Sequence, residues 1–444
     1  MNKDLTQGSP AKVLWMFTIP MFVSVIFQQM YNIADSVVAG KFAGEDALAA
    51  VGASYPITMI FMAVAVGSNI GCTVVISQLF GAKRFGELKT AVTTTLLSST
   101  VISCILMALG LIFCRPMLSG LQTPANIFDD GALYLNIYIG GFLFLFLYNV
   151  STGIFTSLGD SRTPLYFLIG SSLGNIALDL IFVIVFHWGV AGVAWATFLA
   201  QGAACILALA ALKKRMKTVL SEERAPLFSW DMLKRISVVA VPSILQQSFI
   251  SVGNLFIQSL VNSFGSSVIA GYSAAVKLNT FTITSLTTLG NGLSSFTAQN
   301  IGAGKVDRVK SGFKAGLGMG LLAVTAFFAV YWFFPEAVMH IFMEESGGLA
   351  MQTGTEFLKI VSPFYIVIMG KLIADGVIRG AGCMKQFMIA TFTDLILRVM
   401  LSYILAVPMG SAGIWLSWPI GWSIAAVISI GFYLQGRWKQ SGLV

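Results

Sequence analysis

Twelve long apolar runs are the feature that most constrains the fold of this chain. Each run is long enough to cross a hydrocarbon core about 30 Å thick. Backbone polar groups in lipid must find partners within their own segment, so runs of this kind fold as helices. We therefore predict an all-α membrane protein with twelve transmembrane helices, at residues 12–37, 51–79, 91–114, 131–157, 164–186, 190–212, 235–262, 268–298, 312–334, 353–379, 386–407 and 411–436.

Charge supports the membrane assignment. Only 10% of the residues are charged, whereas soluble domains carry about 25%. The most charged stretch, 213–234, lies between the sixth and seventh runs. We predict that it is a cytoplasmic linker between an N-terminal six-helix lobe, 1–212, and a C-terminal six-helix lobe, 235–444.

The two predicted lobes repeat each other in sequence. Pro20 corresponds to Pro242, and Gln78 to Gln299, at offsets of 222 and 221 residues. Because each lobe has an even number of spans, both repeats have the same orientation. Transporters with parallel repeats bind their substrates near the membrane midplane.

Basic loop residues indicate the orientation. Twenty-one of the 27 Lys and Arg residues lie at the termini and in the loops that follow even-numbered spans. The opposite loops carry only Lys41, Arg115 and Lys359. Cytoplasmic loops are enriched in Lys and Arg, so we expect both termini in the cytoplasm of a multi-pass protein of the plasma membrane.

Ionisable residues within spans are costly and mark candidate functional sites. Two pairs, Lys371 with Asp375 and Asp394 with Arg398, have i, i+4 spacing, which allows an ion pair on one helix face. Lys277 has no such neighbour. The full set is Asp35, Asp179, Lys277, Lys371, Asp375, Asp394 and Arg398.

Asp35 and Asp179 are the candidate proton-binding residues. Neither has a basic residue within one turn of its span. Burial without a counter-charge favours the protonated form of a carboxylate, so such a group can bind and release protons at physiological pH. Asn32 and Asn175 lie one turn before these acids, and Asn149 of the fourth span adds another amide. We predict a polar network of these five residues within the first lobe.

Other residues complete the candidate site. Pro20 lies four turns before Asp35, and proline bends a helix, so we predict a hinge there. Candidate residues of the substrate cavity are Gln28, Tyr31, Lys277, Asp375 and Arg398.

Several functions lack support in the sequence. The only histidines are His187 and His340, both in outer loops, and no nucleophile–base pair or metal-ligand cluster accompanies them. The five cysteines have no paired spacing, so we expect free thiols. We predict no enzyme activity, no catalytic residues, no metal, no cofactor and no nucleic-acid partner.

At this point the chain resembles the multidrug and toxic compound extrusion (MATE) family, and within it the branch of DinF-like and Gram-positive multidrug exporters. The resemblance covers the whole chain and rests on Pro20, Tyr31–Asp35, Asn175–Asp179, the paired turns at Gly81 and Gly302, Gly159–Asp160 and Arg379–Gly380. It implies V-shaped lobes and cation-coupled antiport of lipophilic cations. The NorM-like branch is expected to carry acids near Ile250 and Ile368, which this chain lacks.

These observations predict a monomeric, proton-coupled exporter of lipophilic cationic drugs or toxic compounds that works by alternating access among membrane lipids. Two alternatives stay open. One is coupling to Na⁺ instead of H⁺. The other is a flippase for an anionic lipid-linked or polysaccharide precursor, which would need a cationic cavity.

Overall fold

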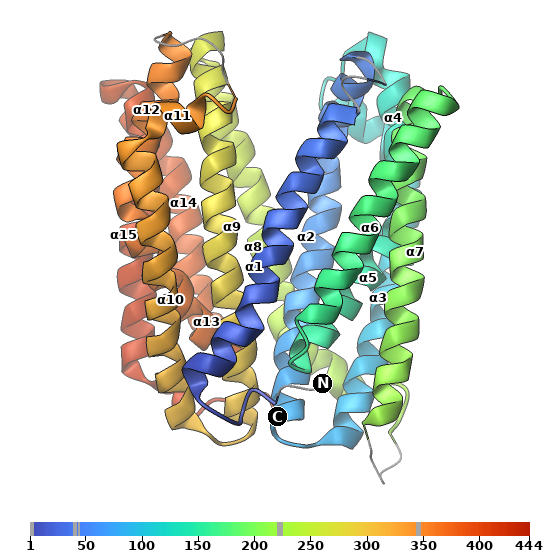
Figure 1. The fold of residues 1–444 in the computed structure, drawn as a ribbon, viewed down its shortest axis with the longest axis vertical. Helices are drawn as coiled ribbons and strands as arrows, with labels where there is room; N and C mark the ends of the chain where they lie inside the picture. Colours follow the sequence, from blue (N-terminus) through green and yellow to red (C-terminus); the bar gives the residue numbers. More distant parts are fainter. Residues whose placement is uncertain (1–3, 39–41, 43–44, 220–224, 343–347) are drawn as a thin grey trace. The chain divides into compact units, whose positions relative to one another are not determined.

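The computed structural model (Figure 1) describes residues 4–38, 42, 45–219, 225–342 and 348–444, with the backbone alone for 34–37 and 45–48. Every regular element in these ranges is a helix. Packing divides the chain into two compact units: unit 1 contains Ile19–Ser248, and unit 2 contains Leu5–Thr18 and Phe249–Val444.

Unit 1 is built around α2 (Glu45–Gly81), whose packing partners include four helices that lie entirely in this unit. These are α3 (Phe85–Gly120), α4 (Ala125–Gly140), α5 (Phe142–Ser157) and α7 (Gly189–Thr218). Between α5 and α7 in sequence, α6 (Arg162–Leu180) continues into a π-helix, η2 (Ile181–Val185). In unit 1, α6 packs mainly on α7.

Unit 2 has a corresponding long helix, α9 (Ser266–Gly302), of the same 37-residue length as α2. It packs on α10 (Val306–Phe333), α12 (Leu349–Val361) and α13 (Tyr365–Gly380). The short elements are α11 (Pro335–Met339), η3 (Ser362–Phe364) and η4 (Arg437–Lys439). The C-terminal helices α14 (Met384–Met409) and α15 (Ser411–Gln435) pack on each other.

Two helices are shared between the units. The division falls between Thr18 and Ile19 within α1 (Pro10–Val38), and between Ser248 and Phe249 within α8 (Trp230–Asn262). The first part of α8 joins unit 1 because glycines of α2 let the two backbones touch: a Cβ on Gly71 would lie 2.5 Å from the Cα of Ala240. This grouping differs from the predicted boundaries at 212 and 235; the predicted lobes rest on the sequence repeat and stay a prediction.

All twelve predicted spans are helical. Ten described helices, or eleven with one bent pair, are long and apolar enough to cross a membrane by length and composition. The helix outside that set is α9, which is rich in Ser, Thr, Asn and Gly. Many of these polar side chains are buried inside unit 2, among them Asn279 and Thr282.

Two predicted spans are interrupted. The span predicted at 131–157 is the bent pair α4 and α5, with an angle of 47° at Gly141. A Cβ on Gly141 would lie 2.9 Å from the ring of Phe198 on α7, so only glycine fits beneath that ring. The span predicted at 353–379 contains the 3-10 turn η3, which includes Pro363.

Candidate functional site

Two buried polar side chains of α6 form the centre of the candidate site. Asn175 is 2% exposed and Asp179 is fully buried. They are four residues apart and therefore lie one above the other on the same helix face. The π-helix η2 begins two residues after Asp179. Single-turn π segments within helices are frequent at functional sites.

Asn175 connects three helices of unit 1. The Tyr31 hydroxyl of α1 donates a hydrogen bond of 2.6 Å to Asn175 Oδ1. Asn175 Nδ2 donates a longer one, 3.4 Å, to the hydroxyl of Thr197 on α7. One amide thus uses its acceptor toward α1 and its donor toward α7, and this fixes which way the amide faces.

A polar cavity of about 100 Å³ surrounds this amide. Among the residues whose side chains are described, no Asp, Glu, Lys or Arg lines it; its lining combines hydroxyl and amide groups with apolar side chains. Its lining residues are Gln28, Tyr31, Met62, Leu145, Tyr148, Asn149, Leu168, Ser171, Ser172, Asn175, Thr197, Ala200 and Gln201.

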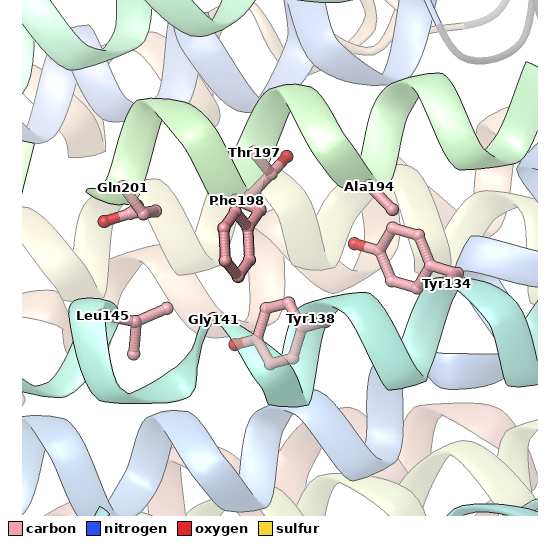
Figure 2. Close-up of a pocket in the computed structure, with 8 residues that line it drawn as sticks. All are labelled: Tyr134, Tyr138, Gly141, Leu145, Ala194, Thr197, Phe198 and Gln201. Atoms are coloured by element: carbon pink, nitrogen blue, oxygen red, sulfur yellow. The ribbon is translucent and has the colours of Figure 1, made fainter. Parts of the chain in front are cut away.

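A smaller cavity of about 10 Å³ lies beside it, between α4, α5 and α7. Figure 2 shows the ring of Phe198 on α7 pointing toward the helix that carries Gly141. Thr197, Gln201 and Leu145 line both cavities. The two cavities therefore share part of their walls.

Asn149 has a different role from the predicted one. Its side-chain amide donates to the Leu145 carbonyl of its own helix, at 2.9 Å. Its backbone carbonyl accepts a 2.8 Å bond from Asn69 of α2. Asn149 thus lines the cavity and holds α5 to α2, but its amide bonds neither Asn175 nor Asp179 in the described structure.

The α1 residue that bonds Asn175 is the neighbour of Asn32, the residue predicted for the polar network. Asn32 is exposed, and its amide donates to Gln29 of the same helix at 3.3 Å. Tyr31, predicted as a cavity residue, is the one that bonds Asn175. The Asp35 side chain lies outside the described residues. Pro20 stands within the continuous helix α1, and Ser24 donates to its carbonyl at 2.9 Å.

In unit 2 the predicted pair Lys371 and Asp375 is present and buried. The Lys371 ammonium lies 2.6 Å from Asp375 Oδ2, and Ser429 of α15 donates to the other carboxylate oxygen at 2.6 Å. Both side chains of the ion pair are at most 6% exposed. This cluster holds α13 to α15.

The predicted pairing of Asp394 with Arg398 is wrong. The ion pairs of the described chain do not include it. Instead the Arg398 guanidinium lies 4.5 Å from the ring centre of Trp418 on α15, a cation–π contact. Helical spacing allowed the ion pair, but the neighbouring indole face captures the arginine.

Two other cationic residues do not match the predicted list of substrate-cavity residues. Lys277 is exposed, with its ammonium 5.7 Å from the ring centre of Phe342. Arg379, which the sequence reasoning did not select, is buried, donates to Asn291 and lies against Phe387.

The structure adds site residues that the sequence reasoning missed. Ser171, Ser172, Thr197 and Gln201 are small polar side chains within apolar runs. Helical spacing was the available signal on α6. Leu168, Ser172, Asn175 and Asp179 recur at intervals of three or four residues and therefore follow one face of that helix. Among the described residues no group of three or more His, Cys, Asp or Glu could hold a metal ion. All five cysteines are free thiols.

Comparisons with known proteins agree on one family. The MatE family model matches residues 20–181 and 242–404. The chain is 28% identical over 441 residues to the probable multidrug resistance protein YpnP of Bacillus subtilis, covering 99% of this chain and 98% of that protein. It is 26% identical over 373 residues to the FAD transporter of Shewanella oneidensis, covering 81% and 78%. A solved structure described as the outward-facing conformation of a multidrug resistance MATE family transporter superposes with a TM-score of 0.91 at 22% identity, covering 99% of both chains.

Proposed function

Because this chain belongs to the MatE family of transporters, we propose that it exports lipophilic cationic compounds in exchange for protons. Membership confirms the predicted transporter class and all-helical fold. The proposed export adds a substrate class and a coupling ion. The observation that carries it is the Tyr31–Asn175 bond at the polar cavity, one turn from the fully buried Asp179.

In this proposal Asp35 and Asp179 bind the coupling proton. Asp35 follows Tyr31 by four residues in α1. Asp179 follows Asn175 by four residues in α6. Protonation neutralises a carboxylate, so the hydrogen bonds that hold α1 against α6 change partners. Asn32 and Asn149 lie beside these residues, and in this proposal their hydrogen bonds change at the same step.

Pro20 supplies the hinge of the proposed mechanism. Its ring removes one backbone hydrogen bond from the middle of α1. The part of α1 after Pro20 carries Gln28 and Tyr31, both of which line the cavity. Bending at Pro20 would move these side chains into the cavity and displace a bound compound.

The cavity chemistry supports a lipophilic cation. Tyr31 and Tyr148 offer aromatic faces, which attract cations, and Met62 offers a polarizable, adaptable surface. Drug-sized pockets are usually about 300–1,000 Å³. The cavity of about 100 Å³ is smaller, so loading a compound requires α1 to move outward.

Orientation and assembly are part of the same proposal. The loop charges support a cytoplasmic position for both termini, and in this proposal transport runs outward across the plasma membrane. We expect a monomer in lipid to be the working form.

The decisive experiment uses proteoliposomes. Efflux of a fluorescent lipophilic cation is measured with the proton gradient and the sodium gradient imposed separately. Export driven by the proton gradient alone supports the proposal. Export driven by sodium alone selects the alternative coupling ion, and no export under either gradient rejects drug export.

A second candidate substrate class is anionic. Three buried cations lie in unit 2, namely Lys371, Arg379 and Arg398, against the buried acids Asp375 and Asp394. A relative is named as a transporter of FAD, which is an anion. The same proteoliposomes loaded with FAD separate this candidate, because the proposed exporter of cations should leave FAD inside.

A further inference from the structure

The segment before α1 is fixed in unit 2 although most of α1 belongs to unit 1. Leu5 and Leu14 are fully buried, and Thr6 and Phe17 are at most 5% exposed. Gly8 has a φ of +74°, which lets the chain turn from this segment into α1. A buried segment outside a helix needs specific contacts, because its backbone polar groups must find partners.

Polar side chains at the turn between α9 and α10 provide those contacts. The Leu5 amide donates to Gln299 Oε1 at 3.0 Å. Asn300 Nδ2 donates to the Leu5 carbonyl at 3.3 Å. The Lys305 ammonium donates to the Thr6 carbonyl at 2.8 Å.

Arg308 of α10 makes further contacts with this segment, and we call the whole set of contacts the clamp. Its Nη1 donates to the Gly8 carbonyl at 2.7 Å. Its Nη2 lies 3.2 Å from both the Leu5 and Gln7 carbonyls, and its Nε donates to Asn300 Oδ1 at 3.0 Å. One rigid guanidinium thus binds three carbonyls of the segment, which a lysine could not reproduce.

The described part of the other half of the repeat shows no equivalent of these contacts. At the offset of 221 residues, Arg308 corresponds to Glu87. Glu87 pairs with Arg84 and, at 3.5 Å, with Arg235. In its described part, the linker beside it donates a bond to α3, from the Ser229 amide to Thr94 Oγ1 at 3.1 Å, next to a groove of about 260 Å³. The clamp is therefore a specific feature of the N-terminal segment.

We propose that Leu5–Gly8 and Arg308 form a latch that fixes the starting end of α1, so that bending at Pro20 moves only the part of α1 beyond it. This inference rests on the proposed function. The division between the units falls at Thr18 and Ile19, directly before Pro20. A hinge transmits motion to the cavity only if one of its arms is held.

The two cationic residues of the latch are accessible to water. Lys305 is exposed and Arg308 half-buried, so water can replace their bonds to the carbonyls. Opening would free both arms of α1 and uncouple bending from the cavity. The latch thus sets how efficiently a bend at Pro20 is converted into displacement of Gln28 and Tyr31.

The test uses the full-length protein in nanodiscs and the variant Arg308→Ala. The control is Lys310→Ala, on the same helix, because Lys310 pairs only locally with Asp307 at 2.8 Å. Hydrogen exchange of residues 5–9 should rise at least tenfold in Arg308→Ala alone. Export of the fluorescent cation should fall severalfold, with its Kd within twofold of wild type. Arg308→Lys should give an intermediate result, and it decides the question if Arg308→Ala does not fold.

A second readout does not depend on transport. In a cysteine-free background, Gln28→Cys is labelled with an impermeant maleimide, with and without Arg308→Ala. The latch predicts a severalfold change in labelling rate, whereas a static anchor predicts none. An unchanged labelling rate, or wild-type export with the segment released, overturns the latch. Wild-type protein that exports nothing rejects the proposed function, while the labelling comparison still judges the latch.

Discussion

The hydroxyl of Tyr31 lies 2.6 Å from the side-chain oxygen of Asn175, and this hydrogen bond joins α1 to α6 at the polar cavity. Asn175 lies one turn from Asp179. The residue pair therefore connects the proposed moving helix with the proposed proton site.

The first prediction concerns that bond. Tyr31→Phe removes the hydroxyl and leaves the ring, and a neutral hydrogen bond contributes about 0.5–1.5 kcal/mol. We expect the affinity for a fluorescent cation to fall roughly three- to tenfold, with folding intact. Tyr166→Phe, at an exposed tyrosine of the same α6, is the control. Equal affinities in both variants would show that the bond does not contribute to binding.

The second prediction concerns proton coupling. Asp35→Asn should abolish export driven by a proton gradient, and Asp179→Asn should reduce it at least tenfold, because the amide cannot take up the proton. In the wild type, cation binding should weaken as pH falls, since protonated carboxyls no longer attract the cation. In each Asn variant this pH dependence should flatten.

Binding titrations between about pH 5 and 8, beside proteoliposome export, check this. Asp231→Asn, at an exposed acid, should behave as wild type. Full proton-driven export in Asp35→Asn would remove that residue from the coupling site.

The third prediction concerns the hinge. Pro20→Ala restores a helix hydrogen bond and stiffens α1. We expect severalfold slower export with substrate binding largely unchanged. Pro56→Ala is a matched control, because Pro56 also lies inside a helix, α2. If both variants export equally well, Pro20 is a static kink.

The fourth prediction concerns the buried ion pair of unit 2. Asp375→Ala leaves the Lys371 ammonium buried without its counter-charge, which typically costs about 3–5 kcal/mol. The double variant Lys371→Met with Asp375→Leu should recover most of that loss. Asp129→Ala, which breaks the exposed pair with Arg115, should cost at most about 1 kcal/mol. Thermal unfolding in one detergent compares all three, and an unstable double variant would contradict the electrostatic explanation.

The fifth prediction concerns orientation. In a cysteine-free background, cysteine at Asp129 should be labelled by an impermeant reagent from outside intact cells. Cysteine at Lys214 or Lys310 should be labelled only after the membrane is opened. The reverse pattern would place the termini outside.

Much of the fold follows from apolar run length alone. All twelve predicted spans are helical, since lipid leaves the backbone no other way to satisfy its polar groups. The close contact between Gly141 and the ring of Phe198 could not be predicted, because Phe198 belongs to a helix much later in the chain. Likewise, the i, i+4 spacing of Asp394 and Arg398 could not reveal that Trp418 would take the arginine.

The candidate site was predictable only in part, because the sequence shows which residues share a helix face but not how one helix is rotated against another. Asn175 and Asp179 are buried on one face, as their spacing indicated. Which residue of α1 meets them depends on the rotation of that helix, and adjacent residues point about 100° apart. Packing sets this rotation, so Tyr31 and not Asn32 bonds Asn175.

The polarity of α9 has a consequence for how the protein is made. Asn279 and Thr282 are bonded to hydroxyls of Tyr365 on α13 and Tyr331 on α10. The ribosome delivers α9 before either partner, so α9 meets the bilayer without these bonds between helices. We expect it to wait beside the translocon until the later helices arrive. A chain truncated after Gly302 and carrying a glycosylation reporter should fail to insert α9, whereas the full-length chain inserts it.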